Sequence, residues 1–228
     1  MSIALIIGAG AGLSASLARK LSSRGHQVVL ASRDPSDLST LCEQTGATAI
    51  ACNARDRDDV AALFERIDAM DGDLEVAVYN PSARVRGGIT ELDPQAVENA
   101  ILVTAYGAFL MAHHAARRME ARGRGALLFT GASAGVKGFA NSSTFAMGKF
   151  ALRGLCQSLA RELHPKGIHV GHFVIDGGIA DAVRPERAQE GDAMLEPDAI
   201  ADSYMHFLDQ HRSSWAWEIE LRPWVERF

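Results

Sequence analysis

A cluster of small residues near the start of the chain has the composition of a phosphate-binding turn. An apolar run at residues 3–7 breaks into the sequence GAGAGLS at residues 8–14, and a helical pattern follows. Glycine permits positive φ and close backbone approach to a ligand, and the amides and dipole at a helix start favour a phosphate. The spacing G-x-x-x-G-x-S predicts a strand, a turn and a helix that bind a dinucleotide, although a tight turn in an unrelated α/β protein is the alternative. The predicted cofactor contacts in this turn are Gly8, Gly10, Gly12 and Leu13.

The end of the second predicted strand carries a residue that bears on the choice of cofactor. Residues 27–31 form a buried strand pattern that ends at Ser32-Arg33-Asp34-Pro35. In a dinucleotide fold an acid at this point binds the ribose 2′-OH, whereas an arginine accommodates the 2′-phosphate of NADP. Asp34 is explained as a helix N-cap before Pro35. Arg33 therefore favours NADP(H) over NAD(H), with an ordinary exposed, solubilising arginine as the alternative.

The composition is that of a single globular domain. The chain has 228 residues, of which 47% are hydrophobic and 22% charged, with a net charge of −5. This size suits one domain over residues 1–228 with a large core, and the absence of a basic stripe argues against nucleic acid. No apolar run approaches the ~20 residues of a membrane span, so we expect no membrane segment and a cytoplasmic location. Three cysteines without C-x-x-C spacing predict free thiols and no metal site.

Strand patterns alternate with helical patterns along the chain, and no linker or repeat interrupts them. This order predicts right-handed crossovers and an α/β fold: a Rossmann-like, doubly wound parallel sheet in three layers. The strands are expected at residues 3–7, 27–31, 47–52, 74–79, 126–130, 168–174 and 215–221, and the longest helices at 94–119 and 142–164.

Taken together, these motifs make nearly the whole chain resemble a short-chain dehydrogenase/reductase. The glycine turn matches the family's turn, Asn80-Pro81-Ser82 falls on its Asn-Ala-Gly after strand four, and Phe145 to Lys149 falls on its Tyr-x-x-x-Lys. Its Pro-Gly after strand six falls on Asp176-Gly177. The resemblance implies a nicotinamide-dependent oxidoreductase of a small molecule, with a substrate-covering loop at residues 178–197. The implied further cofactor contacts are Asn53, Asn80, Lys149 and Gly177.

The departures from the family pattern concern catalysis. The family's catalytic tyrosine falls on Phe145, its serine on Ala132 and its asparagine on Thr104, so of the tetrad only Lys149 is kept. The family's tyrosine is the general acid/base, and its lysine lowers the tyrosine pKa and holds the nicotinamide ribose. Lys149 remains on the same helix face one turn away and is expected to bind the ribose, with an exposed surface lysine as the alternative.

Other hydroxyl groups lie close to the missing ones in sequence. Ser133 adjoins the serine position and is our candidate catalytic hydroxyl beside Lys149, and Tyr106 is the next residue to test. Serines and threonines at residues 142–144 are more typical of helix caps than of catalysts. Reduction of a carbonyl by the usual route is in doubt, whereas reduction of an activated C=C bond asks less of the tyrosine. The alternative function is a catalytically impaired NADP(H)-binding sensor or structural module.

The two longest predicted helices, residues 94–119 and 142–164, resemble those through which family members pair. The last predicted strand also carries two tryptophans. We therefore expect a closed homodimer or homotetramer. Packing of those tryptophans within one subunit is the alternative.

Overall fold

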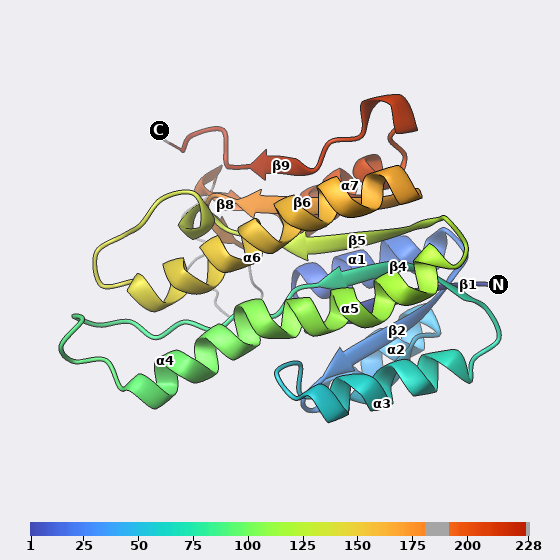
Figure 1. Ribbon diagram of the computed structural model, residues 1–228, viewed down its shortest axis with the longest axis horizontal. Coiled ribbons are helices and arrows are strands. Elements are labelled where there is room, and N and C mark those ends of the chain that lie inside the picture. The colour runs from blue at the N-terminus through green and yellow to red at the C-terminus, as the bar shows by residue number, and fades with distance from the viewer. Residues whose placement is uncertain (181–191, 227–228) are drawn as a thin grey trace.

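One parallel sheet forms the centre of the molecule (Figure 1). The computed structural model describes residues 1–180 and 192–226. The strand order is β3-β2-β1-β4-β5-β6-β9, and every neighbouring pair is parallel. The strands are β1 Ser2–Ile7, β2 His26–Ser32, β3 Thr48–Ala51, β4 Asp73–Tyr79, β5 Gly125–Thr130, β6 Ile168–Ile175 and β9 Glu218–Leu221. The predicted α/β, doubly wound fold is confirmed, and the first six strands lie within one residue of their predicted bounds.

Helices cover both faces of the sheet and complete the three layers (Figure 1). On one face lie α3 Arg57–Asp68, α4 Pro94–Ile101, α5 Gly107–Glu120 and α6 Ser143–Leu163; on the other lie α1 Leu13–Ser23, α2 Ser39–Thr45 and α7 Pro197–Leu208. Short elements join them: 3₁₀ turns at Pro35–Leu38, Ser133–Gly135, His164–Lys166 and Arg212–Ser214, and the strand pair β7 Gly178–Ile179 and β8 Met194–Leu195.

Alternation along each strand divides the core in two. In β1 the side chains of Ile3 and Leu5 join the cluster that packs under α3, α5 and α6, whereas those of Ala4 and Ile6 join the cluster under α1 and α7. All four side chains are fully buried. Because strand side chains point alternately to opposite faces, a strand covered on both sides must be apolar throughout. This explains the unbroken apolar run before the glycine turn.

The predicted helix 94–119 is continuous but changes its winding midway. Residues Leu102–Tyr106 form a π-helical segment between α4 and α5. A π segment disturbs the regular helical hydrogen bonds, and here the Tyr79 hydroxyl donates to the Val103 carbonyl. The Thr104 Oγ1 atom accepts from the Ala83 amide at 3.1 Å. The irregular turn is therefore tied to the end of β4 and to the segment after it.

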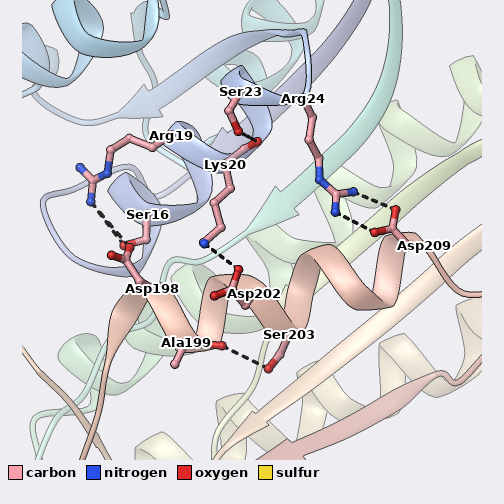
Figure 2. A network of polar contacts seen from close by, with 10 residues as sticks. All are labelled: Ser16, Arg19, Lys20, Ser23, Arg24, Asp198, Ala199, Asp202, Ser203 and Asp209. Atoms are coloured by element: carbon pink, nitrogen blue, oxygen red, sulfur yellow. Dashed lines mark hydrogen bonds and ion pairs between the residues drawn. The ribbon is translucent and has the colours of Figure 1, made fainter.

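Ion pairs join the two helices on the opposite face, α1 and α7 (Figure 2). The Lys20 Nζ atom lies 2.6 Å from Asp202 Oδ1, and the Arg24 guanidinium donates two hydrogen bonds to Asp209 at 2.9 and 2.7 Å. A longer pair of 4.0 Å links Arg19 to Asp198. These pairs are solvent-exposed and individually weak, but their matched spacing fixes the alignment of α7 against α1.

Two expectations about the chain are corrected. The last strand begins at Glu218, because the Trp215 ring instead stacks on His169, with the ring centroids 4.3 Å apart. The composite helix 94–120 is, by length and a mean hydropathy of 1.2, apolar enough to cross a membrane, contrary to the expectation that no such segment exists. This is weak evidence for a membrane, since core helices pass the same test and α5 buries Ala108, Met111 and Ala115 against the sheet.

Candidate active site

The glycine turn between β1 and α1 is held by hydrogen bonds to Ala31 of β2 and to Asn80, the residue after β4. Gly8 has φ +83°, and a Cβ atom there would lie 2.7 Å from Pro81, so both backbone conformation and space require glycine. The Ser14 hydroxyl donates to the Gly8 carbonyl at 2.9 Å and accepts from the Asn80 side-chain amide at 2.7 Å. The strand order reverses between β1 and β4, which is the crevice where open α/β sheets bind ligands.

A first pocket of about 970 Å³ opens from this turn toward the ends of β2 and β3. Of the predicted cofactor residues, Gly8, Arg33, Asn53 and Asn80 line it. Gly10 and Gly12 lie in the turn itself, where an added Cβ would meet no atom within 4 Å. Leu13 is buried in the core under α1, so only its backbone remains for a cofactor. The volume suits a small organic ligand.

The end of β2 places both Arg33 and Asp34 at this pocket. Arg33 is exposed. The Asp34 carboxylate accepts from the Ser36 amide at 3.0 Å and from the Ser36 hydroxyl at 2.7 Å, and these bonds lower the pKa of Asp34. The predicted N-cap is therefore confirmed, although the helix that it caps is a short 3₁₀ turn. Arg33 is thus accompanied at the pocket by a carboxylate whose Oδ1 atom caps the next turn.

A second pocket, of about 1020 Å³, adjoins the first at Asn80 and Ser82. Three further predicted site residues, Ser133, Lys149 and Gly177, line it. The structure thus places the predicted site residues along one crevice at the carboxyl edge of the sheet. Sequence reasoning could bring them together only through the resemblance, since they are separated by more than 160 residues of chain.

Lys149 is a buried cation, so the alternative of a surface lysine is wrong. Its side chain is 1% exposed, and its Nζ atom donates to the Thr130 carbonyl at 2.7 Å. Burial, and to a smaller extent the nearby Arg84 guanidinium, lower the pKa of Lys149 from 10.5 to about 7. The ammonium can therefore hold or release a proton near neutral pH.

Two apolar side chains share this pocket with Lys149. Phe145 is one helical turn before it, and Ala132 lies at the start of the loop after β5. Both line the pocket and are buried, together with Ala134. Neither side chain can donate or accept a proton, whereas Ser133, which is half-buried, and Ser142 also line the pocket and carry hydroxyl groups.

The helix start at Ser142 differs from the expectation of a cap. Ser142 is the N-cap residue of α6, but its side chain makes no capping hydrogen bond, and it lines the second pocket instead. Asn141 before it has φ +57°, the only non-glycine residue with positive φ in the described ranges. This left-handed residue turns the chain into α6 and brings Ser142 to the pocket.

Two other residues considered from the sequence lie outside the pockets. Thr104 is buried and bonded to the Ala83 amide, so it supports the segment after β4 from behind. Tyr106 is 39% exposed, stacks on Phe109 and lines neither pocket. Its position gives no support to a role as proton donor.

Several pocket residues were not singled out from the sequence. Arg84 and Arg86 lie in the segment after β4 and line the second pocket, and Arg55 lines the first and donates to Asn99 on α4. Arg84 and Arg86 come shortly after the motif Asn80-Pro81-Ser82. Their closeness to this motif is the feature of the sequence that could have marked them as site residues. Within residues 1–180 and 192–226 no group of three or more metal-ligating side chains forms a metal site.

The chain belongs to the short-chain dehydrogenase family, since the family model, described as short chain dehydrogenase, matches residues 2–190. It is 33% identical to a cis-4-hydroxycyclohexanecarboxylate dehydrogenase from Sinomonas cyclohexanicum, over 78% of this chain and 73% of that protein.

Solved structures agree in fold over almost the entire chain. A short-chain dehydrogenase from Rhodopseudomonas palustris superposes with a TM-score of 0.85 at 32% identity, covering 98% of this chain and 99% of that one. A metagenomic short-chain oxidoreductase in complex with NADP superposes with a TM-score of 0.84 at 27% identity, covering 98% of each chain. The protein is therefore an oxidoreductase of this family, with a small-molecule substrate and a nicotinamide cofactor.

Proposed function

We propose that this protein is an NADP(H)-dependent reductase. In this proposal Lys149 binds the cofactor and holds a proton at the site, and the family's catalytic tyrosine and serine are replaced by Phe145 and Ala132. The observation that carries the proposal is the buried Lys149 ammonium in a pocket that is walled by Phe145 and Ala132 and that adjoins the pocket at the glycine turn. The matching of Phe145 and Ala132 to the family's tyrosine and serine rests on their spacing from Lys149.

The residues present fit a nicotinamide dinucleotide. Open space above Gly10 and Gly12 at the start of α1 suits a pyrophosphate, since helix amides and the helix dipole favour anions. Asn53 and Asn80 line the same pocket, and Gly177 and Lys149 line the adjoining one. Lys149 would hold the ribose through its ammonium. When bound, the cofactor supplies or accepts a hydride.

The preference for NADP(H) rests on the end of β2. Arg33 lines the pocket while the Asp34 carboxylate is engaged by Ser36. A guanidinium there favours a 2′-phosphate by charge-assisted hydrogen bonding, and the Asp34 carboxylate already accepts two hydrogen bonds from Ser36 through its Oδ1 atom.

The absence of a phenol beside Lys149 favours reduction of an activated C=C bond over reduction of an ordinary ketone. A ketone oxygen needs a proton donor as its negative charge develops, whereas hydride addition to an enone moves that charge into a conjugated system. Lys149, whose pKa is about 7, can hold a proton near this site, and the Ser133 and Ser142 hydroxyls can donate hydrogen bonds.

A substrate-covering loop is also part of the proposal, and it is assigned from the family resemblance alone. The expected substrate-covering loop, residues 178–197, falls largely on residues 181–191, which lie outside the described residues. Its flanks are β7 and β8, which pair in parallel beside Gly177. We propose that this segment covers the Lys149 pocket.

A homodimer or homotetramer is part of the proposal. Phe109 on α5 and Met147 and Phe150 on α6 are 45%, 54% and 46% exposed, so the outer faces of both helices carry apolar side chains. Such faces are typical of association surfaces. Light scattering at micromolar concentration should give at least twice the mass of one chain, and a monomer would contradict this part of the proposal.

The function is tested by separating cofactor binding from turnover. Calorimetric titration with NADPH and NADH should give tighter binding of NADPH, and Lys149→Ala should weaken it while Lys166→Ala, an exposed control, should not. NADPH oxidation is then followed with enones and with simple ketones. Faster turnover of enones supports the proposal, robust ketone reduction contradicts it, and binding without any turnover favours the sensor or structural module.

A further inference from the structure

The four lysines of the chain differ in whether a carboxylate pairs with their amine. Three of them reach solvent, and each forms an ion pair: Lys20 with Asp202 at 2.6 Å, Lys166 with Glu120 at 3.0 Å and Lys137 with Asp176 at 3.7 Å. The fourth, Lys149, is 1% exposed. Within residues 1–180 and 192–226 no carboxylate forms an ion pair with its Nζ atom, whose hydrogen bond goes to the Thr130 carbonyl at 2.7 Å.

The surroundings of this amine favour its neutral form. Apart from the Thr130 carbonyl, the walls beside it are the apolar Phe145 and Ala132. A neutral amine donates a hydrogen bond to a carbonyl as an ammonium does, whereas a buried ammonium loses its hydration without gaining an opposite charge. The lowered pKa of Lys149 has burial as its main cause and agrees with this geometry. The neutral amine carries a lone pair that a substrate carbon can accept.

Three titratable groups near Lys149 are uncharged around pH 7. Burial raises the pKa of the Cys156 thiol, which lies on the same helix. Burial lowers the pKa of His172 on β6 to about 4. The Tyr204 hydroxyl lies 2.9 Å from Thr130 Oγ1, and burial raises its pKa. None of these groups therefore supplies a negative charge to the lysine.

The charged groups on the neighbouring elements do not supply one either. Asp176 after β6 is paired with two other cations at 3.7 Å, and Glu218 on β9 accepts two hydrogen bonds from Arg153 at 2.7 and 2.8 Å. The Arg84 guanidinium disfavours the ammonium further. The other charged residues that line the pocket in the described ranges are Arg86 and Glu226, both exposed.

We propose that Lys149 is a nucleophilic amine that forms a Schiff base with small aldehydes and ketones in the second pocket. The amine lone pair attacks the carbonyl carbon, and the carbonyl oxygen takes up a proton to give a carbinolamine. Loss of that oxygen as water, with both hydrogens of the amine, leaves a C=N bond, so no oxidant or reductant is consumed. Desolvated lysines react in this way, and the hydroxyls of Ser133 and Ser142 line the pocket and can pass protons to the oxygen.

The pocket suits an uncharged carbonyl compound of moderate size. Its volume is about 1020 Å³, and Phe145 and Ala132 can contact an aromatic or aliphatic body. This inference goes beyond the proposed function, since it needs no cofactor. The proposed ribose contact uses the same nitrogen atom. A bound dinucleotide and a carbonyl compound should therefore exclude each other at Lys149.

The test is reductive trapping in the cofactor-free protein. Benzaldehyde and sodium cyanoborohydride are added at pH 7, the reductant converts a C=N bond into a stable secondary amine, and peptide masses locate the adduct. Lys149 should be labelled at least about ten-fold faster than Lys166, because a fall of three pKa units raises the neutral fraction roughly a thousand-fold and lower basicity offsets only part of this. Benzyl alcohol should add no mass. The α-amino group of Met1 also titrates near neutral pH and is scored from its own peptide.

Variants, denaturant and pH distinguish the buried amine from a generally accessible one. Lys149→Met should lose the adduct in the peptide of the pocket, and Lys166→Met should keep it. The preference for Lys149 should disappear in concentrated urea, where its pKa returns to the ordinary value. In the native protein the labelling rate at Lys149 should level off above about pH 8, whereas at Lys166, whose ion pairs raise its pKa, it should rise beyond pH 10.

The outcomes separate this inference from the proposed function. Absence of label at Lys149 in the native protein, or labelling no faster than at Lys166, would overturn the inference whether or not NADPH binds. Rapid labelling of Lys149 that saturating NADPH suppresses would support both proposals. Rapid labelling that saturating NADPH leaves unchanged would support the nucleophilic amine and contradict the ribose contact.

Discussion

Replacing Lys149 by methionine should stabilise the fold while weakening the site. The side chain is 1% exposed, and burial lowers its pKa from 10.5 to about 7. In the unfolded chain the amine holds its proton up to about pH 10.5, so between pH 7 and 10.5 the unfolded state binds more protons and stability rises with pH. At pH 7 the cost of the buried charge is about 4 kcal/mol, from 1.36 kcal/mol per pH unit.

Methionine removes the free-energy cost of burying the ammonium but adds the smaller cost of an unsatisfied carbonyl group. The Thr130 carbonyl loses its 2.7 Å donor, and leaving a buried acceptor unsatisfied costs about 1–3 kcal/mol. Since methionine has a similar shape and no charge, Lys149→Met should raise the free energy of unfolding at pH 7 by about 1–3 kcal/mol, in line with replacements of other buried charges. NADPH affinity should fall in the same variant.

Urea denaturation at pH 7 and pH 9.5 measures both effects. The wild-type free energy of unfolding should rise by about 3 kcal/mol between these pH values through this group, and the rise should be absent in Lys149→Met. Lys166→Met, which alters an exposed ion pair with Glu120, should change stability by less than about 1 kcal/mol at either pH. A Lys149→Met protein that is less stable than the wild type at pH 7 would refute the reasoning.

Three further predictions concern the cofactor, the chemistry and acid stability. Arg33→Ala should reduce the preference for NADPH over NADH by about ten- to a hundred-fold in calorimetry, and equal wild-type affinities would remove Arg33 as the discriminator. Phe145→Tyr combined with Ala132→Ser should create or raise ketone reduction by up to about 10²–10⁴-fold in NADPH oxidation assays, because the phenol would lie one turn from Lys149. Burial lowers the pKa values of His169 and His172 from 6.5 to about 4, so stability is lost as pH falls through this window. Each should cost about 2 kcal/mol between pH 7 and pH 5, and a flat urea midpoint would contradict this.

Local sequence patterns were enough to predict the sheet and the glycine turn. Six strands fall where apolar runs predict them, because a strand buried on both faces must be apolar along its whole length. Gly8 is required by its positive φ, and the cap at Asp34 is made with atoms only two residues away. These features depend on neighbours in the chain or on burial alone.

The tertiary structure decided the features that depend on distant contacts. Trp215 left the last strand because His169, far away in sequence, offers a ring to stack on. Ser142 follows a cap pattern yet makes no capping bond, since the left-handed Asn141 brings it to the pocket. The spacing of Phe145 and Lys149 indicated a shared helix face but not that the lysine is buried.

The approach of Arg84 to the Lys149 pocket is likewise invisible in the sequence. Its guanidinium lies over Phe145 because the segment after β4 passes the start of α6, about 60 residues further along the chain. A sequence specifies which side chains can carry charge, and local patterns predict which segments are buried. Which charges meet in one cavity depends on how those segments pack, and that packing lowers the pKa of Lys149.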